Sequence, residues 1–298
     1  MTTPVALITN LCKQQALEHS EDFARSSIEE IRFFLCRQHQ QRTPKVYSKG
    51  VVITIQGYKE AYCAGQKLAY GPGQCLVAAS NLPMECETFA SPEKPLMGMC
   101  IDLDSKIISE LSLLLKQHNG DDYFDGVVGN GIAVFDQDES FKHTVHSLLA
   151  VLSSPVEAVA LGNHYYRELH YRLLTSPQRH LVATLCQQDH VLSRISQVTE
   201  FIQNHYEKKL TVEVLAQQAG MSISAFHRAF KQAVEDSPLQ YLKKIRLTQA
   251  KRLMAHHGLA ANSAAFEVGY ESPAQFSREF KRYFGLPPSK AAQIGFQS

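Results

Sequence analysis

The sequence lacks several features that mark common classes of protein. No stretch approaches the roughly 18 to 20 consecutive apolar residues that a membrane-spanning helix needs, and the N-terminus has neither the basic nor the apolar region of a secretion signal. Its seven cysteines are an odd number and include no Cys-x-x-Cys pair, which argues against a disulfide framework or a zinc knuckle. We therefore expect a cytoplasmic protein, associated with the bacterial nucleoid when it binds DNA, that has no membrane partner.

Signatures of metal binding and catalysis are missing as well. No histidine occurs between His39 and His118, so most of the strand-rich region lacks the imidazoles of a typical metal site. No Ser/His/Asp arrangement and no glycine-rich phosphate loop stands out elsewhere. We predict that the protein is not an enzyme, needs no cofactor and holds no metal.

Charge divides the chain into two unequal parts. The 298 residues carry a net charge of only +1, but from Val191 onward there are 14 Lys and Arg against 8 Asp and Glu, which leaves 16 against 21 for residues 1–190. A basic C-terminal part on an acidic body is the asymmetry expected when one part alone meets a polyanion. A chain of this length also favours two domains.

The first hundred residues predict short strands. Seven β-prone segments, separated by Gly, Pro, Asn or Ser, predict an antiparallel sandwich or barrel. The segments are 31–36, 45–47, 51–55, 59–63, 74–78, 84–89 and 96–103. Helical apolar stripes follow at 107–115, 140–152 and 156–174. These stripes either pack on their own sheet or form a dimer interface, and the pattern leaves both open.

A small pattern occurs twice in the last third of the chain. An Ala-x-x-x-Gly segment is followed by a Phe-x-Arg-x-Phe-Lys segment, first around Gly220 and then around Gly269. The two Phe-x-Arg-x-Phe-Lys segments are 50 residues apart. Each copy predicts a helix, a tight turn and a second helix with phenylalanines on one face and cations on the other. This is the helix-turn-helix arrangement that places a recognition helix in a DNA major groove. The N-caps of these helices are predicted at Thr211, Ser222, Ser263 and Ser272, and Gln275 would complete a capping box with Ser272. The exposed faces are predicted to carry Ser224, His227, Arg228 and Lys231, and Ala274, Ser277, Arg278 and Lys281.

Residues 191–289 resemble the DNA-binding domain of the AraC/XylS family of bacterial transcription regulators, most clearly over 265–289. The resemblance implies that the first recognition helix presents Ser222, Ser224, His227 and Arg228, and the second Pro273, Ala274, Ser277 and Arg278. Since Pro273 and Ala274 have no hydrogen-bonding side chain, we expect the second helix to contribute more to affinity than to sequence readout.

The motifs at 56–60, 70–77, 81–84 and 101–104 are similar to an N-terminal domain found fused to such regulators, which is related to the cupin β-barrel. That resemblance implies effector sensing and dimerisation. The residues that bind the effector are not identified by these motifs. An alternative is a thiol sensor of electrophiles or oxidants at Cys63, Cys75 and Cys86, if these lie on neighbouring strands. Non-covalent binding inside the barrel and a purely dimerising role stay open beside it.

The sequence therefore predicts an α+β protein with three segments. Residues 1–175 form a cupin-like, antiparallel β domain with flanking helices, 176–190 a linker, and 191–298 an all-α domain of two helix-turn-helix units. Its predicted function is that of a sequence-specific transcription regulator. Its expected partners are double-stranded promoter DNA, a small-molecule effector, a second copy in a homodimer and, if it is an activator, RNA polymerase.

Overall fold

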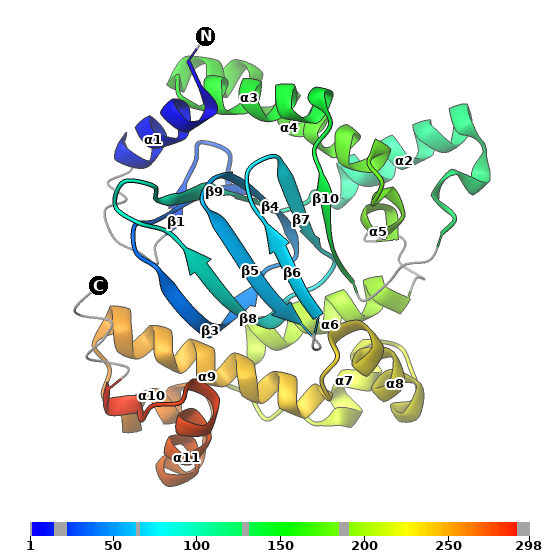
Figure 1. The fold of residues 1–298 in the computed structure, drawn as a ribbon. Coiled ribbons are helices and arrows are strands. Elements are labelled where there is room, and N and C mark those ends of the chain that lie inside the picture. Colours follow the sequence, from blue (N-terminus) through cyan, green and yellow to red (C-terminus); the bar gives the residue numbers. More distant parts are fainter. Residues whose placement is uncertain (1, 15–22, 64–65, 127–130, 185–190, 291–298) are drawn as a thin grey trace.

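The computed structural model describes residues 2–14, 23–63, 66–126, 131–184 and 191–290. Two antiparallel sheets face one another in the N-terminal half. Helices cover the outer face of one sheet, and the C-terminal helices lie below the sheets in Figure 1. This arrangement confirms the predicted α+β class with an antiparallel β unit and an all-helical C-terminal part.

The first sheet has six strands in the order β1-β2-β9-β4-β7-β10. Its strands are β1 (Phe23–Arg25), β2 (Ile31–Cys36), β4 (Gly50–Gln56), β7 (Gln74–Ala78), β9 (Leu96–Ile101) and β10 (Ile132–Asp136). Side chains alternate between its two faces. In β2, Phe33 joins the core under the helices while Phe34 packs into the core on the opposite face.

The second sheet has four strands in the order β3-β8-β5-β6. They are β3 (Gln40–Tyr47), β5 (Tyr58–Cys63), β6 (Gln66–Tyr70) and β8 (Leu82–Phe89). Leu82, Met84 and Cys86 are buried and alternate with half-buried neighbours along β8, so one face of this sheet is apolar. That face and the inward face of the first sheet enclose what we call the barrel interior.

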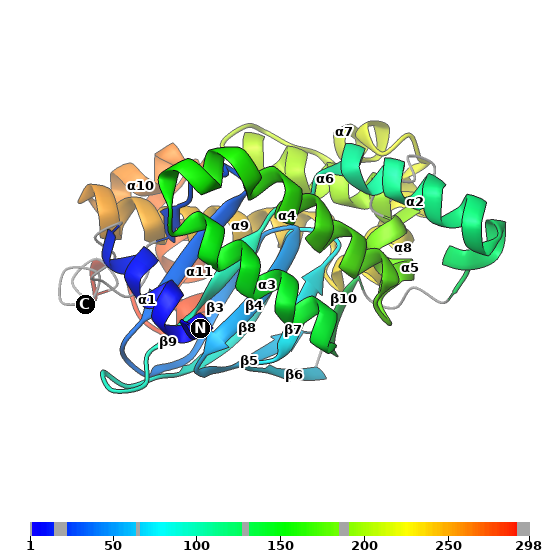
Figure 2. The same cartoon turned by 90° about the horizontal axis from the view of Figure 1, so that it is seen from above.

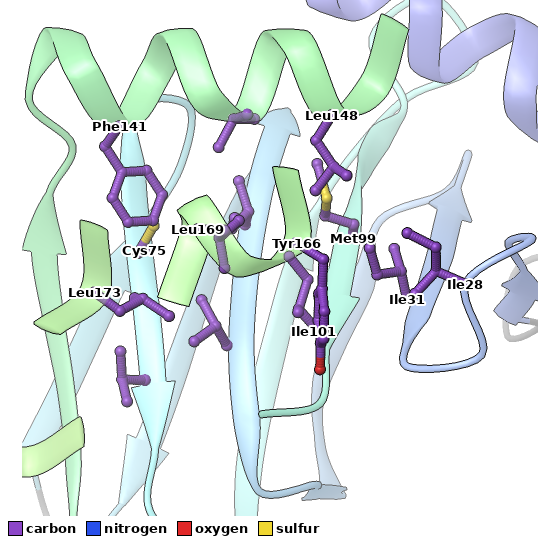
Figure 3. Packing of buried hydrophobic residues seen from close by; sticks show 14 of the residues in the cluster. Ile28, Ile31, Cys75, Met99, Ile101, Phe141, Leu148, Tyr166, Leu169 and Leu173 are labelled. Atoms are coloured by element: carbon purple, nitrogen blue, oxygen red, sulfur yellow. The ribbon is translucent and has the colours of Figure 1, made fainter. Parts of the chain in front are cut away.

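Five helices and a short 3-10 turn belong to the N-terminal half: α1 (Pro4–Gln14), α2 (Ser105–Asn119), η1 (Asp121–Phe124), α3 (Glu139–Leu152), α4 (Pro155–Thr175) and α5 (Arg179–Thr184). Helices α3 and α4 lie across the first sheet (Figure 2). Leu148, Leu169 and Leu173, all fully buried, meet Met99 and Ile101 from β9 in one core (Figure 3).

Most of the helical stripes therefore pack on their own sheet. In α2, Ile108, Leu111 and Leu115 are buried, whereas Leu114, predicted in the same stripe, is 55% exposed. The segment predicted as a linker is also partly structured. Helix α5 lies within it and buries Leu181 in the N-terminal core. Residues 185–190 of the predicted linker lie outside the described residues.

The C-terminal half is helical throughout its described part. Its helices are α6 (Val191–His205), α7 (Val212–Gln218), α8 (Ile223–Val234), α9 (Pro238–His257), α10 (Ala261–Glu267) and α11 (Pro273–Phe284). No helix in the described ranges combines the length and the apolar character required to cross a membrane.

Candidate DNA-binding surface

The first repeat folds as helix, turn and helix. The Thr211 side chain accepts a hydrogen bond from the amide of Val214 and caps α7, and Ser222 caps α8 in the same way at Ala225. Between the helices Gly220 has a φ of +61°, a left-handed conformation that favours glycine. The turn predicted from the sequence is thus present with its expected backbone.

Helix α8 separates an aromatic face from a polar face, although Ile223 at its start is 49% exposed. Phe226 and Phe230 are 0% exposed, and their ring centroids lie 5.4 Å apart in a T-shaped contact. The opposite face is exposed and carries every residue predicted for the first recognition helix. These residues are Ser222, Ser224, His227, Arg228 and Lys231.

The second repeat has the same construction. Gly269 has a φ of +87°, and a Cβ there would lie 2.4 Å from the carbonyl oxygen of Glu207, so both the conformation and the close approach require glycine. Ser272 caps α11 by accepting from the amide of Gln275, and Pro273 occupies the first turn. The side chain of Gln275 donates to Glu279, so the reciprocal half of the predicted capping box is not seen.

Helix α10 begins differently from the prediction. Ser263 was expected at its N-cap, but α10 starts at Ala261, and Ala260 holds the cap position without a side-chain hydrogen bond. Ser263 is therefore within the helix. This shift of a few residues leaves the turn and the recognition helix unchanged.

Helix α11 also exposes its cations. Phe276 and Phe280 are 0% exposed, with ring centroids 5.4 Å apart. Ala274, Arg278 and Lys281 are exposed, and Pro273 and Ser277 are half-buried. The sequence prediction omitted Gln275 and Arg282, which are also exposed on this helix. Helical spacing could have predicted their exposure, because Gln275 is one residue before Phe276 and Arg282 is four residues after Arg278.

The acidic residue on α11 is paired with a cation and accepts hydrogen bonds from its surroundings. Glu279 lies 3.1 Å from the ammonium of Lys243 in α9 and accepts a hydrogen bond from the Tyr270 hydroxyl. Burial alone would raise the pKa of Glu279, but the hydrogen bonds from Tyr270, Lys243 and Gln275 outweigh it and lower that pKa. This carboxylate therefore stays ionised but paired, which reduces its repulsion of DNA.

Helix α9 holds the two units together. Its 20 residues correspond to about 30 Å at 1.5 Å per residue, close to the ~34 Å of one DNA turn. The guanidinium of Arg246 donates to the carbonyl oxygens of Tyr206 and Lys208, at 2.7 and 2.9 Å, and ties α9 to the loop before α7. The connection is thus a single helix braced at its centre.

The first unit is also joined to the barrel. The hydroxyl of Tyr241, fully buried in α9, donates to the carbonyl oxygen of Asn81 at 2.9 Å, just before β8. Helix α9 contacts both β3 and β8. Phe226, Phe230 and the barrel residue Leu82 belong to one hydrophobic cluster, whereas Phe276 belongs to a separate one.

The three cysteines singled out from the sequence do not form one group. Cys63 and Cys86 lie on the adjacent strands β5 and β8, but Cys75 lies on β7 in the other sheet and joins the core under the helices. The expectation of three neighbouring strands is therefore wrong for Cys75. Burial raises the pKa of the Cys63 thiol to about 11 and that of Cys75 further. Raised pKa values oppose the thiolate that a reactive sensor requires.

Among the residues that the structure describes, no group of three or more His, Cys, Asp or Glu side chains is placed to hold a metal ion. The absence of a metal from the function remains a prediction.

Two family models match this chain. The model of the AraC-type transcriptional regulator N-terminus matches residues 27–181, slightly more than half of the sequence. A helix-turn-helix domain model matches residues 215–293, which include both repeats.

Two relatives illustrate the extent of sequence similarity. The lactose operon transcription activator of Staphylococcus xylosus is 27% identical over 158 residues, which cover 53% of this chain and 57% of that protein. The transcriptional activator Btr of Bacillus subtilis is 35% identical over 96 residues, covering 32% and 18% respectively. The alignments thus span at most about half the length of these relatives.

A solved structure shows the same overall fold. Wild-type ToxT from Vibrio cholerae, determined with a bound unsaturated fatty acid, superposes with a TM-score of 0.57 at 10% identity, over 88% of this chain and 94% of that one. At this identity the likeness concerns the fold alone.

Proposed function

Because the chain belongs to the AraC-type transcriptional regulators, we propose that it regulates transcription by binding promoter DNA with its two helix-turn-helix units. The observation that carries this proposal is the opposite orientation of the phenylalanines and arginines. In both recognition helices the phenylalanines are fully buried and Arg228 and Arg278 are exposed. An exposed arginine on a recognition helix can make a bidentate contact with guanine O6 and N7.

In the proposed complex the two units occupy successive major grooves on one face of the duplex. The length of α9 and the bracing by Arg246 support this arrangement. Arg228, with Ser224 and His227 as neighbouring hydrogen-bonding groups, reads bases in one groove. Lys231, Lys281 and Arg278 mainly bind the backbone, which fits the absence of hydrogen-bonding side chains at Pro273 and Ala274.

The N-terminal half would regulate this binding as a cytoplasmic effector sensor without catalytic activity. The hydrogen bond from Tyr241 to Asn81 and the shared hydrophobic cluster support such control, because a change in the barrel reaches the first unit directly. If the protein is an activator, RNA polymerase is its further partner.

We also propose that the protein acts as a homodimer. Leu113 and Leu114 in α2 and Val156 and Val159 in α4 remain 55 to 84% exposed, and these apolar side chains support a second copy as partner. Sedimentation at micromolar concentration, with and without DNA, measures this. A monomer under both conditions would contradict the dimer.

The proposed DNA-binding activity is tested by selecting duplexes from a random pool with the full-length protein and footprinting the enriched sequence. We expect protection of two major-groove segments about one helical turn apart. Enrichment of no sequence above the starting pool, at salt concentrations where total binding is measurable, would contradict sequence-specific recognition.

A further inference from the structure

Three segments of the C-terminal half meet at one side chain in the middle of α9. Arg246 donates from Nε to the carbonyl oxygen of Tyr206 at 2.7 Å and from Nη2 to that of Lys208 at 2.9 Å. Both carbonyls follow the last residue of α6, where no further helical turn provides donors for them. The guanidinium therefore holds the loop 206–210, which leads into the first helix-turn-helix unit, against α9.

The turn of the second unit reaches the same point. A Cβ built at Gly269 would lie 2.4 Å from the carbonyl oxygen of Glu207 and 2.9 Å from Nη2 of Arg246. Gly269 therefore lies directly against the loop of the first unit and against the guanidinium that holds this loop. We call Arg246, Gly269 and the loop 206–210 the junction.

Two further contacts join the units close to the junction. The ring of Tyr206 packs against the hydrophobic cluster of the first unit and also against that of the second. One turn before Arg246 on α9, Lys243 pairs with Glu279 of the second recognition helix at 3.1 Å. The second recognition helix is thus fixed to the same part of α9 as the loop of the first unit.

Arg246 influences DNA binding through the two units and not as a DNA contact. Its side chain is half-buried, and two of its nitrogens donate to backbone carbonyls. If α9 were the only connection, each unit could rotate about the turn at its own end of this helix. The junction removes that freedom, because it joins the first unit directly to the second.

We propose that the junction fixes the angle between the two helix-turn-helix units and thereby makes the protein selective for one spacing of its two half-sites, with Arg246 as the positioning residue. This inference rests on the proposed binding of two successive major grooves. Two rigidly joined units reinforce one another strongly at the matching separation and little at any other, whereas a loose connection gives weaker reinforcement over a wider range. Half-site spacing is then recognised in addition to the bases in each groove.

The test uses the full-length protein and the duplex enriched by the selection, with its two protected segments moved apart by one or two base pairs. Each base pair turns the second segment by about 35° around the duplex axis. We expect wild type to bind the duplex with two inserted base pairs about 10- to 100-fold more weakly, because the second unit no longer meets its groove. Electrophoretic mobility shifts at one salt concentration measure this spacing penalty.

Arg246→Met should lower two quantities together. It keeps much of the apolar stem but loses the donors, so affinity for the selected duplex should fall about 10-fold and the spacing penalty should shrink to about 3-fold. An unfolded domain would instead bind neither duplex. Arg246→Lys keeps the charge but cannot bridge two carbonyls with a planar fork, so its spacing penalty should be intermediate. Arg252→Met removes an exposed arginine from the same helix and should leave the penalty unchanged.

A second substitution shows whether the loosened protein brings its second unit onto the altered duplex. Arg278→Ala should not change the affinity of wild type for the duplex with two inserted base pairs, because the second unit is already disengaged there. In the Arg246→Met background the same substitution should weaken binding to that duplex several-fold. A loss of stability without a change in the angle between the units would not produce this difference.

An unchanged spacing penalty in Arg246→Met would overturn the inference, as would equal binding of all spacings by wild type. Urea unfolding establishes that each variant is folded, and if Arg246→Met is not, an unchanged penalty in Arg246→Lys overturns the inference instead. Selection of a specific duplex by wild type, together with either of these results, refutes this inference alone. Enrichment of no sequence by wild type refutes the proposed function.

Discussion

The two helix-turn-helix units have nearly the same local sequence but different structural support. In the first, Phe226 and Phe230 share a cluster with the barrel residue Leu82. In the second, Phe276 and Phe280 pack only with neighbouring C-terminal residues such as Val268. A repeated pattern thus specifies the same turn twice, while the rest of the fold decides how each copy meets the barrel. The first unit shares its hydrophobic cluster with the barrel, whereas the second meets the barrel through contacts of α11 with β3.

The exposed faces differ in a matching way. The first recognition helix offers Ser224 and His227 beside Arg228, whereas the second offers Ala274 near Arg278. The first helix thus groups a serine and a histidine beside its arginine, whereas the second presents Gln275 near its arginine. The predictions below test this division of roles.

The largest effects should come from removing a buried ring. Phe226→Ala and Phe276→Ala should each cost about 3 to 5 kcal/mol of stability by leaving a cavity. Hydrogen exchange of the full-length protein separates them. Phe226→Ala should increase exchange in α6 and β8 as well as α8, and Phe276→Ala only in α10, α11 and the adjoining part of α9. Unchanged protection of β8 in Phe226→Ala would refute the shared core.

A smaller effect is expected at the exposed arginines. Arg228→Ala should cost about 1 to 3 kcal/mol of affinity for the selected duplex, with a much smaller loss on random DNA. Arg278→Ala should weaken both kinds of DNA to a similar extent. Electrophoretic mobility shifts measure each ratio, and Arg37→Ala, exposed in the N-terminal half, is the control. Equal losses on both DNAs for Arg228→Ala would show that it contacts only phosphate.

The helix ends give a third comparison. Both recognition helices end in a left-handed residue, Glu235 with a φ of 62° in the first unit and Gly285 with a φ of 76° in the second. Gly285→Ala should cost about 1 kcal/mol, because its surroundings are open and only backbone strain is added. Glu235→Gly should change stability by less, with relief of strain offset by glycine's greater entropy when unfolded. Urea unfolding measures both; a neutral Gly285→Ala would contradict the strain argument.

The smallest expected effect is a loss of stability of the N-terminal half at acidic pH. His170 in α4 is fully buried, accepts from the amide of Asp104 through Nε2 and contacts the Tyr166 carbonyl oxygen through Nδ1. Burial lowers its pKa below the ordinary 6.5, so the unfolded chain binds the proton first. The stability of the N-terminal half should fall as the pH drops below about 6.5 toward the pKa of the folded state. His170→Gln should flatten this dependence in urea unfolding at pH 5 to 8, and an unaltered slope would contradict it.

The fold was predictable where the signals were local. Seven strands, the two turns and the caps at Thr211, Ser222 and Ser272 follow from patterns within a few residues. The three strands missed, β1, β6 and β10, all lie at sheet edges and have only three to five residues, too few to show a clear alternation of apolar and polar side chains. Helix α5 was missed because its six residues, which follow Pro177, are too few to show the helical spacing of apolar side chains.

The candidate sites divide along the same line. The recognition faces were predictable because helical spacing alone places Arg228 and Arg278 opposite the phenylalanines. The separation of Cys75 from Cys63 was not predictable, because it depends on which sheet each strand joins.

Helix α9 contains no glycine and, after its first residue, no proline, so one rigid helix connects the two helix-turn-helix units. Each residue in an α-helix turns its successors by about 100°. A single alanine inserted in the middle of α9 would therefore rotate the second helix-turn-helix unit away from its major groove. Four inserted alanines would nearly restore its orientation, at a distance about 6 Å greater. The number of residues in α9 thus sets the relative orientation of the two helix-turn-helix units as well as their separation.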